Sequence, residues 1–247
     1  MPWRRTRDPY RILVSEVMLQ QTSVARVMDK YAGFIRAFPR VRSLAEAATD
    51  SLLGAWKGLG YNRRALSLRS AARLIVSAHR GRVPRSLEEL VALPGIGPAT
   101  AGAVLAYAYG LALPFVETNI RRVFLHFFFP GEDRVTDARI LSLVEKTLDR
   151  ENPRQWYYAL MDYGAMLGRS AVNANTRSVR YRRQKPFEGS FRQLRGAILS
   201  AMLTLKEADA AAIAAAIGTR DERLSMALAG LVEEGFLSRR GRLYCFR

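Results

Sequence analysis

The chain has 247 residues, and its 39 lysines and arginines against 22 aspartates and glutamates give a formal net charge of +17. This charge excludes an electrostatically indifferent surface, and a pI near 10.8 is typical of nucleic-acid binding. Because 49% of the residues are hydrophobic, disorder and low complexity are also excluded. Most of the cations are arginines, which suit bidentate contact with phosphate, although the base composition of the genome is an alternative explanation of the excess.

No stretch of the sequence approaches the ~20 uninterrupted apolar residues that a membrane helix needs. Met1 is followed by Pro-Trp-Arg-Arg rather than by the apolar run of a signal peptide. We therefore expect a soluble, cytoplasmic protein that contacts no membrane. The single cysteine, Cys245, excludes an internal disulfide and a cysteine-rich metal site, so chemistry is expected from carboxylates, hydroxyls or backbone groups.

The first half of the chain carries apolar residues at three- and four-residue spacing, which is typical of short amphipathic helices. The expected helices cover residues 9–25, 26–38, 44–56, 62–78, 87–93 and 99–109. Three further helices follow at residues 118–129, 137–148 and 153–167. The first of these three ends in a run of phenylalanines, so a buried strand is the alternative there, and we prefer a helix.

The composition changes after residue 168, where arginines alternate with small polar residues. Residues 169–186 are predicted to form a basic linker or arm, and a disordered linker is the alternative. Helices are expected at residues 191–203, 207–217 and 221–234, and the last segment alternates around an Arg-Gly turn as a β-hairpin does. Three helices and a hairpin describe a winged helix-turn-helix, which can bind DNA or dock a protein.

The most informative local feature is the string Leu-Pro-Gly-Ile-Gly-Pro-Ala-Thr-Ala-Gly at residues 93–102. Its two glycines permit positive φ, so backbone N–H groups can point outward at the start of the next helix and hold a phosphate. The dinucleotide-binding glycine fingerprint requires a preceding strand, whereas residues 86–92 are helical with a capping-box start. The string is therefore predicted to be a helix-hairpin-helix, with an ordinary turn between packed helices as the alternative.

Several motifs together resemble the helix-hairpin-helix glycosylases, most closely the MutY-type adenine DNA glycosylases. They are Pro-Trp-Arg at 2–4, Asp-Pro-Tyr at 8–10, Ser-Glu-Val-Met-Leu-Gln-Gln-Thr at 15–22, Gly-Leu-Gly-Tyr at 58–61, the hairpin, and Met-Asp-Tyr-Gly-Ala-Met at 161–166. The resemblance implies a mostly α-helical chain. An HhH-GPD glycosylase domain would cover residues 1–168, the arm residues 169–186, and a small winged-helix domain residues 187–247.

Breaking a purine N-glycosidic bond needs a proton on the departing base and negative charge near the oxocarbenium-like sugar. Two carboxylates can divide that work. By resemblance Glu16 protonates the flipped base, and Glu117 occupies the second carboxylate position, where the family has aspartate. Glu16 lies in an otherwise apolar helix, which favours a functional role, whereas Glu117 can alternatively cap a helix.

The resemblance also assigns residues to DNA and to the extruded base. Tyr61 would be the wedge that fills the gap left by base flipping, with a place in the core as the alternative. The other residues expected to bind DNA are Gln20, Gln21, Thr22 and Leu59 at the opposite base, Gly95, Gly97 and Thr100 in the hairpin, and Arg180, Arg182 and Arg183 in the arm. The residues expected to line the base pocket are Trp3, Arg4, Leu19, Ala99 and Tyr158.

The chain departs from the family at several points. No cysteine lies between residues 167 and 184, so we expect no iron–sulfur cluster and no other cofactor, apart from a monovalent cation at the hairpin carbonyls that the resemblance implies. No lysine lies between Lys57 and Lys146, which predicts hydrolysis without the Schiff-base lyase chemistry of endonuclease III-type enzymes. By the same resemblance Tyr157-Tyr158 replaces a polar residue of the adenine pocket, and Ala99 replaces a polar or aromatic neighbour. The Nudix-like domain that reads 8-oxoguanine in the family is replaced by the shorter C-terminal segment.

The expected function is monofunctional excision of a mispaired base, foremost adenine opposite guanine or 8-oxoguanine. The alternatives are a uracil, thymine or damaged-base glycosylase on the same scaffold, and a lesion-binding protein without catalysis. The expected partner is double-stranded DNA with a mismatch or lesion, bound by a nucleoid-associated monomer whose abasic product passes to a downstream endonuclease.

Overall fold

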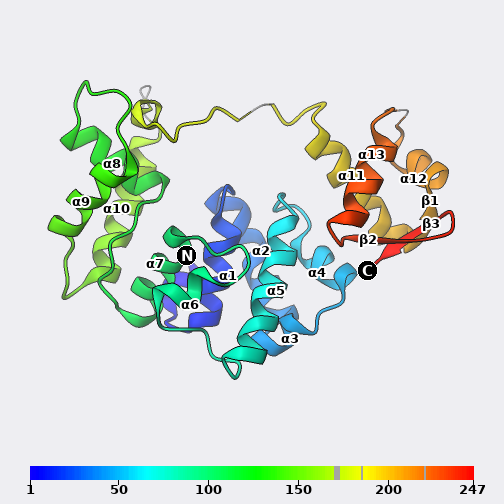
Figure 1. Cartoon of the computed structure of the whole chain (residues 1–247), viewed down its shortest axis with the longest axis horizontal. Helices are drawn as coiled ribbons and strands as arrows, with labels where there is room; N and C mark the ends of the chain where they lie inside the picture. The colour runs from blue at the N-terminus through cyan, green and yellow to red at the C-terminus, as the bar shows by residue number, and fades with distance from the viewer. Residues whose placement is uncertain (170–172, 185, 220) are drawn as a thin grey trace. The chain divides into compact units, whose positions relative to one another are not determined.

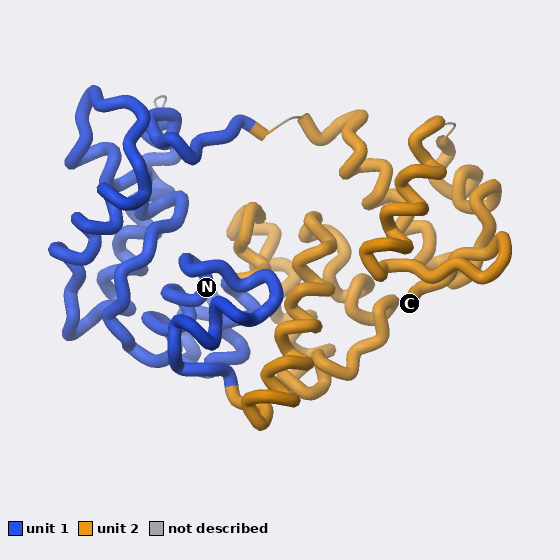
Figure 2. Tube along the Cα trace, in the orientation of Figure 1, with its two compact units in different colours: residues 1–16, 83–183 blue, residues 17–82, 184–247 orange. Residues whose placement is uncertain are grey.

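The computed structural model describes residues 1–169, 173–184, 186–219 and 221–247, and these are mostly helical (Figure 1). They form two compact units (Figure 2). Unit 1 combines residues 1–16 with 83–183, and unit 2 combines residues 17–82 with 184–247. Each unit joins segments that are far apart in the sequence, and the expected domain of residues 1–168 contributes to both. Residues 170–172 and 185 of the expected arm lie outside the described residues.

Unit 1 is built from helices and short helical turns, mostly where the apolar periodicity predicts them. The segment of uncertain type, residues 118–129, is a helix, so the alternative of a buried strand is wrong. The elements of unit 1 are η1 (Pro2–Arg5), the first part of α1 (Pro9–Leu19), α6 (Leu87–Val91), α7 (Pro98–Val104), the π-helical turn η2 (Leu105–Tyr109), α8 (Thr118–Phe128), α9 (Asp137–Thr147), α10 (Pro153–Leu167) and η3 (Ala174–Arg177).

The described part of the arm is attached to α8. Asn175 donates a side-chain hydrogen bond of 3.1 Å to the Thr118 carbonyl at the start of that helix. Arg177 donates to the Leu125 carbonyl at 2.7 Å and to the Phe129 carbonyl at its end. Because carbonyls at a helix end lack intrahelical partners, this guanidinium caps α8. The alternative of a disordered linker is therefore wrong for residues 173–178.

The first helices of unit 2 are α2 (Val24–Ala37), α3 (Val41–Ala45), α4 (Thr49–Trp56) and α5 (Arg63–Ala78). The single helix expected at residues 44–56 is wrong, because the chain breaks between α3 and α4. Two arginines of α5 occupy the carbonyls that the break leaves free: Arg73 donates to the Ala45 carbonyl at 2.9 Å and Arg69 to the Ala47 carbonyl at 3.0 Å. The break is thus held by side chains more than twenty residues away.

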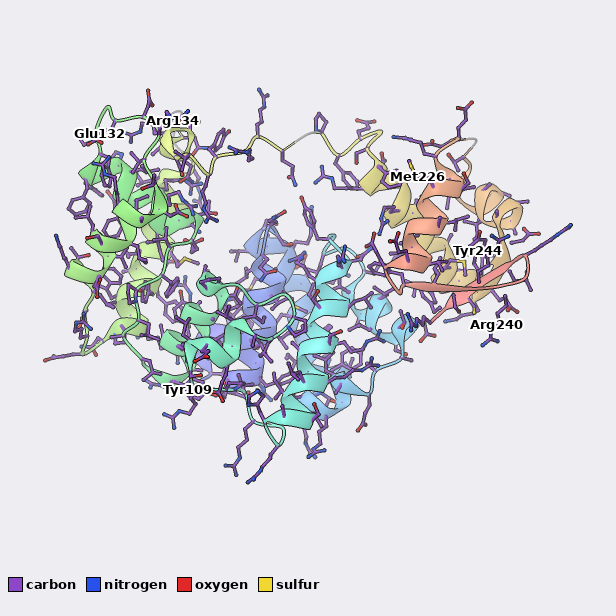
Figure 3. The ribbon with its side chains drawn as sticks, in the orientation of Figure 1. Tyr109, Glu132, Arg134, Met226, Arg240 and Tyr244 are labelled. Carbon is purple, nitrogen blue, oxygen red and sulfur yellow. The ribbon has the colours of Figure 1, made fainter. Side chains whose placement is uncertain are left out.

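The C-terminal part of unit 2 contains α11 (Phe191–Leu205), β1 (Glu207–Asp209), α12 (Ala210–Ile217), α13 (Leu224–Glu233), β2 (Leu237–Arg240) and β3 (Leu243–Phe246). The hairpin of β2 and β3 is confirmed, and its sheet has the antiparallel order β1-β3-β2. Figure 3 labels Arg240 and Tyr244 on this hairpin. The prediction of one helix at residues 207–217 is wrong for its first three residues, because Ala208 pairs with Tyr244 and Asp209 caps α12 through the Ala212 N–H.

The packing of α8 against α10 depends on a glycine. A Cβ atom built on Gly164 would lie 2.4 Å from the Asn119 carbonyl oxygen, much closer than real contacts allow. Arg122 of α8 also donates a hydrogen bond of 2.6 Å to the Gly164 carbonyl. The absence of a side chain therefore lets the two helices approach, and this contact fixes the N-terminus of α8.

We expect Gly164→Ala to lower the free energy of unfolding by about 1–3 kcal/mol, because the methyl group must force the two helices apart. Urea denaturation of the purified variant measures the change. Gly33→Ala is the control: Gly33 lies inside α2 with no atom near its missing Cβ, so alanine there should leave stability equal or slightly higher. Equal effects of the two substitutions would contradict the expectation.

Candidate active site

Glu16 lies near the end of α1 in unit 1, in a run of buried apolar residues. Its side chain is half-buried, and no described residue donates a hydrogen bond to its carboxyl group. Burial, as the largest cause, and the negative charge of Glu117 raise the pKa of Glu16 from 4.5 to about 8, although the positive charge of Arg4 partly opposes them. At neutral pH Glu16 is therefore mostly protonated, although part of its surface still reaches solvent.

Glu117 is the N-cap of α8, as the structural alternative for this residue predicted. Its carboxylate accepts hydrogen bonds from the backbone N–H groups of Asn119 and Ile120, the second at 2.8 Å. Burial raises the pKa of Glu117, but these two donors and the charges of Arg121 and Arg122 oppose the shift. Because Glu117 caps α8 and also lies near Glu16, its capping role does not exclude a chemical role.

The two carboxyl groups therefore sit in unequal environments. Burial is the main cause of the raised pKa of Glu16, and among the described residues the positive charge that opposes it is that of Arg4. Glu117, in contrast, accepts two backbone hydrogen bonds and lies near two arginines. A pair of titratable groups whose surroundings push their pKa values apart suits one proton donor and one anion. The hydrogen-bond donors around Glu117 favour its carboxylate form, and Glu16 has no such donors among the described residues.

An aromatic and cationic wall stands beside this pair. The rings of Tyr107 and Tyr158 are stacked with their centroids 4.5 Å apart. The Arg4 guanidinium lies 4.4 Å from the centroid of Tyr158 and forms a bidentate ion pair with Asp162 at 2.7 and 2.8 Å. Of the five residues expected to line the base pocket, the structure thus brings Arg4 and Tyr158 together.

A buried arginine that sequence reasoning missed fixes this wall. Arg154 of α10 donates hydrogen bonds to the Tyr107 carbonyl at 2.8 Å, to the Arg4 carbonyl at 2.9 Å and to the Thr6 carbonyl at 2.7 Å. In a chain rich in arginine, nothing in the sequence distinguished this one from the surface cations.

The other three residues expected to line the base pocket lie in η1, in α7 and at the end of α1. Trp3 is buried in η1, and Ala99 is half-buried in the first turn of α7, both in unit 1. Leu19 is half-buried at the end of α1 and belongs to unit 2.

The hairpin between α6 and α7 has the expected turn. Gly95 has φ +78°, which requires glycine, whereas Gly97 has φ −91° and is the extended N-cap of α7. The expectation that both glycines use positive φ is therefore wrong for Gly97. Leu93 and Ile96 anchor the turn in the core, Gly95 and Gly97 are exposed, and Thr100 is half-buried.

In unit 2, a single guanidinium ties the end of α1 to the loop before α5. Arg64 donates to the backbone carbonyls of residues 17, 18 and 20, to the Thr22 hydroxyl, and to the carbonyls of Leu59 and Gly60, at 2.5–3.2 Å. Thr22 also donates to the Leu59 carbonyl at 3.2 Å. The residues expected at the opposite base are thus adjacent, although the Leu59 side chain is buried and only its backbone faces this group.

Two residues of this group have backbone conformations that usually need glycine. Gln21 has φ +54° and Tyr61 has φ +47°. Gln21 is exposed, while Gln20 and Tyr61 are half-buried. The Tyr61 hydroxyl accepts a hydrogen bond of 2.7 Å from Arg192 of α11. Sequence reasoning missed Arg64 and Arg192, because neither belongs to a motif.

The three arginines expected to bind DNA in the arm are all exposed. Arg180 forms an ion pair of 3.1 Å with Asp137, and Arg182 donates hydrogen bonds to the carbonyls of Val179 and Tyr181. Arg183 is the third of these exposed arginines.

The donor set does not fit the iron–sulfur cluster of related glycosylases, which takes four cysteine thiolates. The sequence contains one cysteine, Cys245, which lies on β3 with its sulfur 3.2 Å from the Ser238 hydroxyl oxygen. Across the described ranges, no group of three or more His, Cys, Asp or Glu side chains is arranged to hold a metal ion. Within the same ranges, no helix combines the length and apolarity that crossing a membrane requires.

Comparison with protein families identifies the class to which this fold and site belong. A model described as the HhH-GPD superfamily of base excision DNA repair proteins matches residues 14–147. The chain belongs to this superfamily. The match covers both Glu16 and Glu117, the hairpin and the loop that carries Tyr61.

Curated relatives narrow the class, and the resemblance to adenine DNA glycosylases is confirmed. The adenine DNA glycosylase of Mycobacterium tuberculosis (strain H37Rv) is 40% identical over 172 residues, which cover 67% of this chain and 56% of the relative. That of Mycolicibacterium smegmatis is 36% identical over 219 residues, 82% of this chain and 75% of the relative. The chain spans about half the length of the adenine DNA glycosylase of Buchnera aphidicola from Baizongia pistaciae, with 34% identity and 48% coverage of that relative.

Solved structures agree on the fold. A thermostable thymine-DNA glycosylase superposes with a TM-score of 0.60 and 28% identity, covering 67% of this chain and 78% of its own. A trapped endonuclease III–DNA covalent intermediate gives a TM-score of 0.60 at 20% identity, covering 68% of this chain and 78% of its own, which supports the fold alone. The expected mostly helical HhH-GPD fold is confirmed.

The raised pKa of Glu16 has a consequence for stability. Between pH 4.5 and about 8 the folded chain holds a proton that the unfolded chain releases, so the Glu16 carboxyl destabilises the fold increasingly as pH rises. We expect Glu16→Gln to unfold like the wild type below pH 4.5 and to be more stable by about 1–3 kcal/mol at pH 8.5, after allowance for partial solvation.

Urea denaturation across this pH range measures the difference. Glu145→Gln, a change at an exposed glutamate of α9, is the control and should show no growing difference. A Glu16→Gln variant that is no more stable than the wild type at pH 8.5 would contradict the prediction.

Proposed function

We propose that this chain is a monofunctional DNA glycosylase that hydrolyses the N-glycosidic bond of a flipped, mispaired base. The observation that carries the proposal is the pair of carboxyl groups in unit 1: a half-buried, mostly protonated Glu16 near Glu117, which accepts two backbone hydrogen bonds. Family membership and the names of the relatives support the same activity.

The two groups would act on opposite partners of the breaking bond. Glu16 gives its proton to a ring nitrogen of the base, which leaves with the electron pair of the bond to the sugar. The sugar becomes oxocarbenium-like, and the Glu117 carboxylate stabilises this positive charge. Water then adds to the sugar carbon and loses a proton to a carboxylate. General acid catalysis of this kind contributes about 10²–10⁴-fold to the rate.

The substrate we favour is adenine opposite guanine or 8-oxoguanine, because several relatives are adenine DNA glycosylases. A second candidate is a thymine or uracil mismatch. It is favoured by the stacked Tyr107–Tyr158 pair, which places an aromatic wall where the adenine pocket of the family has a polar residue, and by the similarity to a thymine-DNA glycosylase.

We further propose that the hairpin of unit 1 contacts DNA, and that in unit 2 the loops held by Arg64 and the C-terminal part do so as well. Residues 187–247 would form a winged helix, supported by three helices and the β1-β3-β2 sheet, with Arg239, Arg240 and Arg242 exposed on the wing. The partner would be double-stranded DNA bound by a monomer. An abasic-site endonuclease would act downstream.

We also propose that the reaction needs neither a lysine nor an iron–sulfur cluster. The hairpin carries Pro98 and Ala99, and no lysine occurs between residues 57 and 146. The single cysteine cannot supply the four thiolates of a cluster.

The test is a panel of duplexes, each with one adenine mispair, uracil or thymine mismatch, or damaged base, at stated ionic strength because phosphate contacts weaken with salt. We expect release of one base by the wild type and a loss of about 10²–10⁴-fold in Glu16→Gln, with Glu145→Gln unchanged. Borohydride should trap no covalent adduct.

Three results would contradict parts of the proposal. No adenine release from either adenine mispair would overturn the favoured substrate. Tight DNA binding without release of any base would overturn catalysis and favour the lesion-binding alternative, and a trapped adduct would overturn the absence of lyase chemistry.

The pH dependence gives a separate prediction. Because the protonated form of Glu16 is the acid, the single-turnover rate of base release should be constant below its pKa and fall about tenfold per pH unit above about pH 8. Single-turnover assays between pH 6 and pH 10 measure the profile. A rate that rises through this range would show that Glu16 acts as a base instead.

A further inference from the structure

Tyr107 carries a hydroxyl group that the fold leaves without a partner. The residue is only 2% exposed, and its hydroxyl oxygen makes no hydrogen bond to any described residue. A buried polar group left without a hydrogen-bond partner destabilises the fold, because it has lost its hydration and gained nothing in return. A buried, unsatisfied hydroxyl group in a folded chain therefore needs an explanation, such as a bound water or a role in binding or chemistry.

The neighbouring tyrosines show that the same region satisfies hydroxyl groups elsewhere. Tyr109, in the same π-helical turn and labelled in Figure 3, donates to the Val83 carbonyl at 2.6 Å. Tyr157 of α10 donates to the Leu113 carbonyl at 2.7 Å. Tyr107 differs from both, because its hydroxyl alone among these three points to no backbone acceptor.

The position of Tyr107 is fixed from several sides. It lies in the π-helical turn Leu105–Tyr109, and such turns occur frequently at functional sites. Its ring is stacked on Tyr158, and its carbonyl accepts a hydrogen bond from Arg154. These contacts hold both the ring and the backbone of Tyr107.

The surroundings of the hydroxyl are those of the candidate active site. Burial raises the pKa of Tyr107, and the charges of Glu16 and Glu117 raise it further, with Arg4 opposing. Because its pKa is raised above the ordinary value for tyrosine, the phenol is protonated at neutral pH and can donate a hydrogen bond. It lies within electrostatic reach of both carboxyl groups.

We propose that the Tyr107 hydroxyl is a substrate-binding group that donates a hydrogen bond to an acceptor atom, a ring nitrogen or a carbonyl oxygen, of the base that enters this site. The inference rests on the proposed function, since it takes the ligand to be an extruded nucleobase. Because the bound base would accept a hydrogen bond from the Tyr107 hydroxyl, the complex would gain a stabilising interaction that the free protein lacks.

Tyr107→Phe is the test, with Tyr109→Phe as the matched control from the same turn. Tyr107→Phe should keep or raise the melting temperature, because it removes an unpaired group, and should slow single-turnover base release about 3- to 10-fold. Tyr109→Phe removes a satisfied hydroxyl, so it should lower the melting temperature and leave the rate unchanged.

The affinity for duplexes that cannot be cleaved distinguishes a contact with the base from a purely structural role of Tyr107. With a 2′-fluorinated nucleotide carrying the base, Tyr107→Phe should bind about 3- to 10-fold more weakly than the wild type. With a stable abasic analogue at the same position, the two should bind equally.

The outcomes separate the two proposals. Base release by the wild type with equal rates and affinities for Tyr107→Phe overturns the role of Tyr107 and leaves the glycosylase proposal standing. No base release by the wild type overturns the glycosylase proposal, and the affinities then decide on Tyr107. Equal loss of affinity for the base-containing and abasic duplexes would assign Tyr107 to the architecture of the site, against the inference.

Discussion

The Arg154 guanidinium is the interaction on which the arrangement of unit 1 most depends. It reaches from α10 to the carbonyls of Arg4 and Thr6 near the N-terminus and to the Tyr107 carbonyl in the π-helical turn, so one side chain holds together three regions far apart in the sequence. The residues whose carbonyls it binds include Arg4 and Tyr107, which both contact the ring of Tyr158 and form the wall beside Glu16.

The conditions that keep Glu16 protonated are unfavourable for the stability of the fold. A carboxyl group that remains protonated near neutral pH must be removed from water and kept near a second negative charge, and both conditions weaken the fold. Two features offset this loss of stability: the close packing of α8 on α10 at Gly164, and the N-cap that Glu117 provides for α8. The Glu117 carboxylate thus stabilises a helix while its charge raises the pKa of Glu16. One residue thus contributes to the fold and to the electrostatics of the site.

Much of this molecule was predictable from local patterns. Apolar spacing predicted most helices, and glycines and prolines predicted the hairpin. Other features depend on partners distant in the sequence: the break after Ala45 is held by Arg69 and Arg73, and β1 exists because β3 returns beside it. The resemblance supplied Glu16 and Glu117. It did not supply Tyr107, Arg64 or Arg154, because a tyrosine in an apolar helix and an arginine in an arginine-rich chain carry no signal of their surroundings.

The short strand β1 also matters for the behaviour of the chain in solution. A two-stranded hairpin exposes two edges with unpaired backbone groups, and such edges template the addition of strands from other molecules. Here β1 pairs with β3 over three residues and is too short to template much, while the other edge, β2, ends in the exposed pair Arg239 and Arg240. The two edges are thereby protected by brevity on one side and by charge repulsion on the other, which disfavours aggregation through this sheet.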